Sequence, residues 1–225
     1  MQFIFKNKTY AIPASLAQIT LGQRIDFEEQ YGKQISERET AIAAMDEGAD
    51  KQIEQTMYHM ELLCSSFAFF SGIDIAEVKE HIDLTKLCNL FLPCFKQLFE
   101  QQQEVGLQTT YLWNDEVWEL ASPELHYTST MSFNEFLTAK QVVKSLYDLG
   151  EGNWTVLQYL CAIFLRKNEE AFEEYFATPE SERFKLMRTL PMDIALSVAF
   201  FLTSSSKAWL NNSPYLQKEN QEVLI

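Results

Sequence analysis

Glycine and proline are scarce in this chain, with 7 and 6 copies among 225 residues. Both residues mark turns, so their scarcity argues against a sandwich of many short strands and favours helices. Basic residues are also few: 18 Lys and Arg stand against 32 Asp and Glu, which gives a net charge of −14. Nucleic-acid backbones and anionic membranes attract clusters of Lys and Arg, so we expect neither as a partner.

Residues that carry catalysis or bind metals are scattered. The histidines are His59, His81 and His126, and the cysteines are Cys64, Cys88, Cys94 and Cys161. No histidine belongs to an HExxH or HxH pattern, so we expect no metal site. No two cysteines form a CxxC pair, and all four are predicted to be reduced thiols in apolar helices. Glycine-rich phosphate loops and GxSxG are absent, so we predict no cofactor and no enzyme; a dyad of Cys64 with His59 stays open.

The longest apolar run covers residues 194–202 and is interrupted only by Ser197. Pro191 precedes it and suits a first helical position, and Asp193 would meet the positive end of the helix dipole. The run is too short to cross a bilayer, which takes about 20 apolar residues. A helix that is apolar all round must be surrounded by other elements, so we predict the central buried helix of the fold.

The N-terminal half predicts a short hairpin and then helices. Apolar residues at 3–5 and 10–12 flank an Asn-containing turn, which is typical of a β-hairpin. Thr20 and Gln23 fit a capping box, and the helix that they start is expected to end at Gly32. A longer helix is predicted from a cap at Asp50 to Gly72. One apolar stripe follows it at spacings of three and four, formed by Ile53, Met57, Met60, Cys64 and Phe67.

A second hairpin is predicted near residues 108–120, in the sequence QTTYLWNDEVWEL. With a turn at Asn114-Asp115, Tyr111 faces Trp118 across the two strands, and Tyr111, Trp113 and Trp118 share one face with Leu120. Two interpretations of that aromatic face stay open. It packs against helices of the same chain, or it anchors a protein contact, since Trp and Tyr are enriched at interfaces.

The C-terminal tail carries a second candidate contact. Its apolar residues Trp209, Tyr215 and Leu216 lie in polar sequence, and a terminus is ordered only when something ties it down. The chain as a whole predicts a mainly α fold: a helical domain with the short N-terminal β-hairpin and the second hairpin near 108–120. We expect a single domain over 1–225, with the region 106–125 as the candidate seam between two helical halves.

Three segments together resemble structural and assembly proteins of tailed bacteriophages, particularly phages of gut Bacteroidetes. They are FKNKTYAIPASLAQITLGQRIDF, the pair NWTVLQYLCAIFLRKNEEAF with ERFKLMRTLPMDIALSVAFFL, and SFNEFLTAKQ. The resemblance lies in helix starts and apolar runs and implies a role in assembly. It carries over no site residues, because neither phage role described next has a motif that matches here.

Three functions follow as hypotheses. The first is a virion ring or adaptor subunit at the head–tail connector or short tail, forming a homo-oligomeric ring with portal or tail ring proteins as partners. The second is a tail assembly chaperone that binds the tape-measure protein. The third is an uncharacterised soluble enzyme. In the first role the protein is made in the host cytoplasm and located in the virion. Low basic content does not oppose the first, because a channel that passes DNA should not grip it.

Overall fold

The computed structural model describes residues 1–99, 108–121, 131–149, 152–167 and 170–201. It is mainly helical, with a two-stranded sheet at the N-terminus and a three-stranded sheet later in the chain, so the predicted fold class is confirmed. The chain divides into two compact units, Met1–Gln103 and Glu104–Ile225. The prediction of a single domain with a seam near 106–125 stays a prediction.

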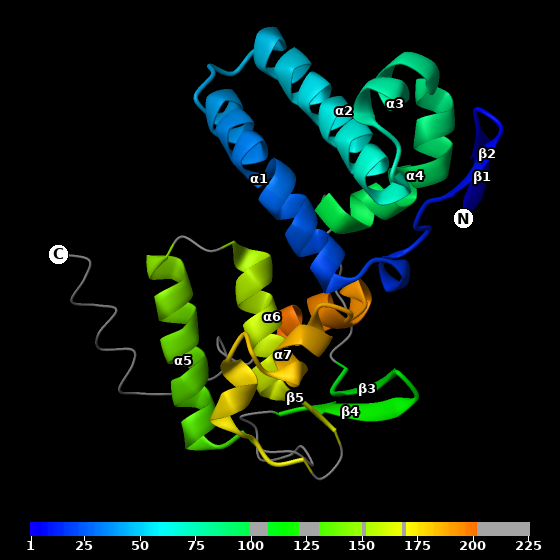
Figure 1. The fold of residues 1–225 in the computed structure, drawn as a ribbon. Helices are drawn as coiled ribbons and strands as arrows, with labels where there is room; N and C mark the ends of the chain where they lie inside the picture. The colour runs from blue at the N-terminus through cyan, green and yellow to red at the C-terminus, as the bar shows by residue number, and fades with distance from the viewer. Residues whose placement is uncertain (100–107, 122–130, 150–151, 168–169, 202–225) are drawn as a thin grey trace. The chain divides into compact units, whose positions relative to one another are not determined.

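The first unit begins with a hairpin and continues with helices (Figure 1). Its elements are β1 (Gln2–Phe5), β2 (Lys8–Ala11), the 3-10 helix η1 (Leu16–Gln18), α1 (Leu21–Ala43), α2 (Ala49–Ser71), α3 (Ile75–His81) and α4 (Leu84–Phe99). The predicted hairpin is confirmed. Lys6 and Asn7 both have positive φ, 45° and 62°, which is the backbone of a two-residue hairpin turn.

Helix α1 is longer than the sequence predicted. The capping box at its start is confirmed: Thr20 Oγ1 accepts the N–H of Gln23 at 3.2 Å, and Gln23 Oε1 accepts the N–H of Thr20 at 2.9 Å. The predicted end at Gly32 is wrong, because the helix continues to Ala43. A glycine inside a helix costs only about 1 kcal/mol. Tyr31 and Ile35, on either side of it, face α2, and this packing outweighs the glycine.

Helix α2 ends as predicted and begins slightly earlier. Gly72 closes it in the left-handed conformation, with φ of 69°, which favours glycine. At the start, Gly48 holds the capping position and Asp50 lies in the first turn, so the predicted cap at Asp50 is wrong. The carboxylate of Asp50 still lies near the positive end of the helix dipole.

The core of the first unit lies where the C-terminal half of α2 meets α1 and α4. Phe27, Phe67 and Phe91 are completely buried there. The rings of Phe67 and Phe91 meet edge to face, with their centroids 6.1 Å apart. Helix α4 contains Pro93, a residue type that kinks or breaks the interior of a helix. The helix continues through the proline, and Figure 1 shows it changing direction along its length, as a lost backbone hydrogen bond allows.

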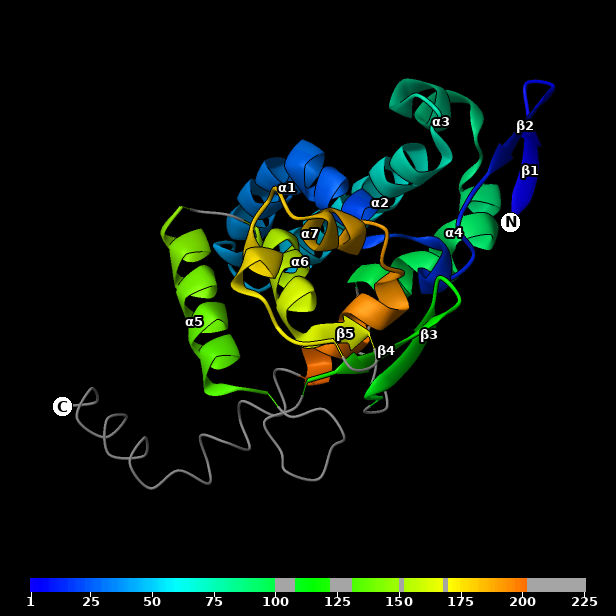
Figure 2. The same ribbon diagram turned by 60° about the horizontal axis from the view of Figure 1, so that its bottom comes forward.

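The second unit combines helices with a three-stranded sheet. Its elements are β3 (Thr110–Trp113), β4 (Glu116–Leu120), α5 (Phe133–Asp148), α6 (Asn153–Phe164), β5 (Leu165–Lys167), the 3-10 helix η2 (Glu174–Ala177), α7 (Glu182–Met187) and a further helix at 192–201. Figure 2 shows β5 beside β4. Sequence reasoning missed β5, which continues directly from the end of α6.

The helix at 192–201 is buried along one side rather than all round. Met192, Ala195 and Val198 are fully buried, whereas Phe200 is 38% exposed. The expectation of a helix surrounded on every side is therefore too strong. Pro191 lies just before the helix, where its carbonyl accepts the N–H of Ala195 at 3.0 Å.

Candidate protein-contact surface

The β3–β4 hairpin has the predicted register. Tyr111 pairs with Trp118, and Trp113 pairs with Glu116. Asn114 and Asp115 form the turn, both with positive φ. The predicted aromatic face exists, and its three large side chains are 5%, 6% and 1% exposed at Tyr111, Trp113 and Trp118.

That aromatic face packs within the chain. The phenol of Tyr111 donates a hydrogen bond to the carbonyl of Gln108 at 2.6 Å, and its oxygen lies 3.1 Å from the hydroxyl of Ser197. The indole of Trp118 donates to the carbonyl of Trp113 at 3.2 Å. Of the two interpretations, this geometry favours packing against helices of the same chain. A protein contact through Tyr111, Trp113 and Trp118 stays a prediction.

The opposite face of the same hairpin is exposed. Leu112 is 74% exposed and Val117 is 49% exposed. The tail residues Trp209, Tyr215 and Leu216 lie outside the described residues, so their role as contacts stays a prediction.

A buried ion pair joins α5 to β5. Glu135 is 1% exposed and pairs with Arg166, whose side chain is 12% exposed. Glu135 also closes a capping box at the start of α5, because it accepts the N–H of Ser132, while Ser132 Oγ accepts the N–H of Glu135 at 3.3 Å. Sequence reasoning did not find the ion pair, which depends on the missed strand β5.

A second arginine lies buried in the same unit. Arg183 donates to the carbonyl of Leu165 at 2.6 Å and forms an ion pair with Glu170. Its guanidinium stacks 4.5 Å from the ring of Phe176 and 5.0 Å from that of Trp118. Burial, and then the charge of Arg166, lowers the pKa of Arg183 to about 10. These partners all belong to the chain itself, so we interpret the group as a structural element.

The suggested Cys64–His59 dyad is not assembled. Both residues lie on α2, five positions apart, which turns the side chains about 140° from each other around the helix. Burial raises the pKa of the Cys64 thiol, and the nucleophilic thiolate is therefore disfavoured. Within the described ranges, no group of three or more His, Cys, Asp or Glu side chains could hold a metal ion.

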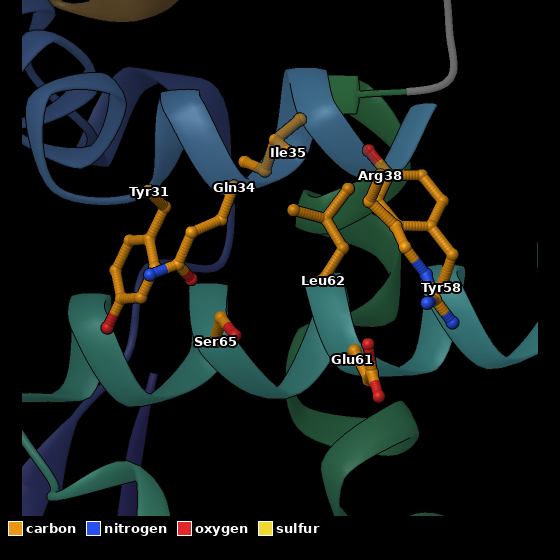
Figure 3. A pocket seen from close by; sticks show the side chains of 8 residues that line it. All are labelled: Tyr31, Gln34, Ile35, Arg38, Tyr58, Glu61, Leu62 and Ser65. Atoms are coloured by element: carbon orange, nitrogen blue, oxygen red, sulfur yellow. The ribbon is translucent and has the colours of Figure 1, made fainter. Parts of the chain in front are cut away.

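A pocket of about 230 Å³ opens between α1 and α2. Its lining residues are Tyr31, Gln34, Ile35 and Arg38 from α1, and Tyr58, Glu61, Leu62 and Ser65 from α2 (Figure 3). Figure 3 shows Tyr31, Gln34 and Arg38 extending from α1 toward α2, with Leu62 between the two helices. The lining is therefore apolar where the helices meet and polar around that contact.

Polar contacts hold the outer part of this helical hairpin together. Arg38 on α1 forms an ion pair with Glu54 on α2, and the phenol of Tyr58 donates to Glu39 Oε1 at 2.7 Å. Burial and then the bond to Glu39 raise the pKa of Tyr58, so it stays a neutral donor. The two helices are thus fixed to each other beyond the core of the unit.

The apolar stripe of α2 divides into a covered part and an exposed part. Phe67 is fully buried and Cys64 half-buried, whereas Ile53, Met57 and Met60 are 57%, 50% and 39% exposed. Helices α3 and α4 both contact α2, and Cys64 and Phe67 lie in the half of α2 that they cover. We call Ile53, Met57 and Met60 the exposed stripe. Sequence periodicity found these residues but did not show that they face solvent.

Comparison with protein-family models, with curated proteins and with solved structures finds no match for this chain. Among the helices that the structure describes, none combines the length and apolar character needed to span a membrane.

Proposed function

We propose that the protein acts through protein–protein assembly, as a ring or adaptor subunit at the head–tail connector or short tail of a tailed phage virion. The exposed stripe on α2 carries this proposal. Large apolar side chains gathered on one exposed helix face are typical of a surface that another chain covers. The resemblance of three segments to phage assembly proteins supplies the class of partner, namely portal or tail ring proteins and further copies of the chain.

The construction of the α1–α2 hairpin suits such a contact. The exposed stripe lies on the side of α2 away from the residues that face α1, such as Tyr58 and Leu62. A partner can therefore cover the stripe without separating the two helices. The Arg38–Glu54 ion pair and the Tyr58–Glu39 hydrogen bond hold the hairpin in one conformation before the partner arrives, which lowers the entropy lost on binding.

A tail assembly chaperone is the second candidate, and the spacing of the exposed stripe favours it. Ile53, Met57 and Met60 follow one another at intervals of four and three residues, the a/d spacing at which one helix receives another. A long helical tape-measure protein would offer such a helix. Methionine adapts its shape to many apolar partners, which suits transient binding along a varied sequence.

The test is the oligomeric state of the purified full chain together with its presence in virions. The ring proposal expects a closed oligomer of fixed size by native mass spectrometry and electron microscopy, and peptides of the chain in purified phage. Met57→Glu should abolish co-purification with the portal or tail ring protein that covers the exposed stripe. Gln52→Glu is the matched control, because it adds the same charge on another face of α2 and should leave that co-purification intact.

Three outcomes decide between the hypotheses. A monomer or dimer that is absent from virions and co-purifies with a tape-measure protein would replace the ring proposal by the chaperone. Co-purification with portal or tail ring proteins that Met57→Glu leaves unchanged would remove the exposed stripe as the basis of the ring proposal. A specific catalytic activity lost on changing His59 or Cys64 would overturn both assembly roles.

A further inference from the structure

We propose that the partner covering the exposed stripe is an amphipathic helix with a basic flank, and that one of its Lys or Arg side chains binds at Glu61 beside the α1–α2 pocket. This inference rests on the proposed role in protein assembly and identifies the chemistry of the partner. Three observations carry it: the spacing of the stripe, the charge along its edge, and the position of the pocket.

The spacing selects a helix as the partner. From Ile53 to Met60 the stripe covers two helical turns, about 10.5 Å, with anchors at positions i, i+4 and i+7. An extended strand repeats its side chains every second residue and would not match these intervals. A partner helix of a few turns presents its own apolar side chains at the same intervals.

The charge along the edge selects a basic partner. Asp50 and Glu61 lie within about 40° of Met57 around the helix axis, so they flank the stripe on one side. Both are exposed, and neither forms an ion pair with any residue that the structure describes. The cations of the hairpin are already engaged, since Arg38 pairs with Glu54 and Lys51 with Glu47 at 2.6 Å. Among the described residues, Asp50 and Glu61 thus keep carboxylates that a cation of a partner can bind.

The pocket gives that positive charge a place to bind. Glu61 belongs to its lining, between the stripe and the seam of α1 with α2. Ile35 and Leu62 offer apolar surface to the methylene stem of a Lys or Arg, and Gln34 and Ser65 offer polar atoms (Figure 3). A cation that enters here leaves its charged end within reach of the Glu61 carboxylate.

Charge also argues against other occupants. If a second copy placed its own stripe here, Asp50 and Glu61 of both copies would come together, and like charges facing each other are unfavourable. The chain carries −14 in total, which repels a nucleic acid and an anionic membrane alike. A basic helix from another protein is attracted by the same field.

The test uses the full chain and a fluorescein-labelled synthetic peptide of about 18 residues, long enough to form a helix. The peptide has Leu at a and d positions and Lys along one flank, and a matched peptide has Glu in place of Lys. Fluorescence anisotropy gives the affinities. We expect the Lys peptide to bind at least about tenfold more tightly than the Glu peptide. We expect this preference to shrink as salt rises from about 0.05 to about 0.5 M.

Variants locate the binding. Glu61→Lys should lower the affinity for the Lys peptide about tenfold and raise the affinity for the Glu peptide. Glu29→Lys is the matched control, because it makes the same change in net charge at an exposed position of α1, and it should alter affinity less than about twofold. Met57→Gln should weaken both peptides. Circular dichroism verifies that each variant keeps its helices.

Each outcome decides something different. Equal effects of Glu61→Lys and Glu29→Lys, or equal affinity for the two peptides, would overturn the inference, because only overall charge or apolarity would then act. Self-association that Met57→Glu abolishes and the Lys peptide does not inhibit would make a second copy the occupant, and the ring proposal would stand without the inference. Site-specific peptide binding by a chain absent from virions would keep the inference and refute the ring.

Discussion

Replacing Glu135 by Gln should destabilise the second unit strongly, and the reason lies in the partner that is left behind. Gln keeps the capping box, since its side-chain oxygen can still accept the N–H of Ser132. It removes the negative charge that faces Arg166. The guanidinium then stays positive in a largely buried place with no counter-charge from Glu135.

The size of the effect follows from burial. Removing one partner of a buried ion pair costs about 3–5 kcal/mol. The side chain of Arg166 is 12% exposed, so water partly reaches it. We therefore expect the free energy of unfolding to fall by about 3 kcal/mol. For a unit of this size the melting temperature should fall by about 12 °C.

Tryptophan fluorescence in urea gives the measurement. The four tryptophans all lie in the second unit, so their emission follows the unfolding of that unit alone; they are Trp113, Trp118, Trp154 and Trp209. Glu116→Gln is the control. Its partner Lys167 is 2.7 Å away, but the two side chains are 46% and 42% exposed, and such a pair contributes below about 1 kcal/mol.

A double variant separates charge from packing. Arg166→Met added to Glu135→Gln removes the orphaned guanidinium and should recover about half of the lost stability. Glu135→Gln could lower the free energy of unfolding no more than Glu116→Gln does. In that case the guanidinium of Arg166 reaches water or another carboxylate in solution, and the reasoning from burial is wrong.

Three further predictions concern stability. Val198→Asp places a charge at a completely buried position and should unfold the second unit, a loss of several kcal/mol visible as solvent-exposed tryptophan emission; native emission would refute it. Gly72→Ala should cost about 1 kcal/mol in urea unfolding followed by circular dichroism, because φ at this cap is 69°, and an unchanged midpoint would contradict the assigned cap. Burial raises the pKa of Cys94 to about 11 and also raises that of Cys161, so above about pH 8.5 the unfolded chain loses thiol protons that the folded chain keeps. The free energy of unfolding should therefore fall as pH rises from about 9 to 11, and Cys94→Ala should reduce that fall; an equal slope in the variant would show that other groups cause it.

Both hairpins could be predicted, and the second in its register, because their turns are local. Asn7 and Asn114 accept the positive φ that a two-residue turn requires, and such a turn fixes which residues face each other. Side-chain alternation then determines the shared face of Tyr111 and Trp118. The sequence could not tell whether that face meets its own chain, because the hydrogen-bonding contact at Ser197 lies 86 residues away from Tyr111.

The length of α1 and the existence of β5 could not be predicted for a related reason. Gly32 is a plausible helix end on local preference alone, and only packing against α2 carries the helix past it. Leu165–Lys167 is a three-residue strand at the end of an apolar helix, and it is a strand because β4 pairs with it. The buried pair of Glu135 with Arg166 depends on that strand, so it was missed as well.

The exposed stripe shows how far periodicity determines burial. The spacing of Ile53, Met57 and Met60 is the same as that of Cys64 and Phe67 further along α2, yet only the latter two lie where α3 and α4 reach. Helices α1 and α2 have 23 residues each, about 35 Å, whereas α3 has 7 and α4 has 16. The longer pair therefore extends beyond its cover and presents apolar side chains to water. On a chain that works alone such a patch promotes aggregation, so a partner that covers it is the simplest reason for its presence.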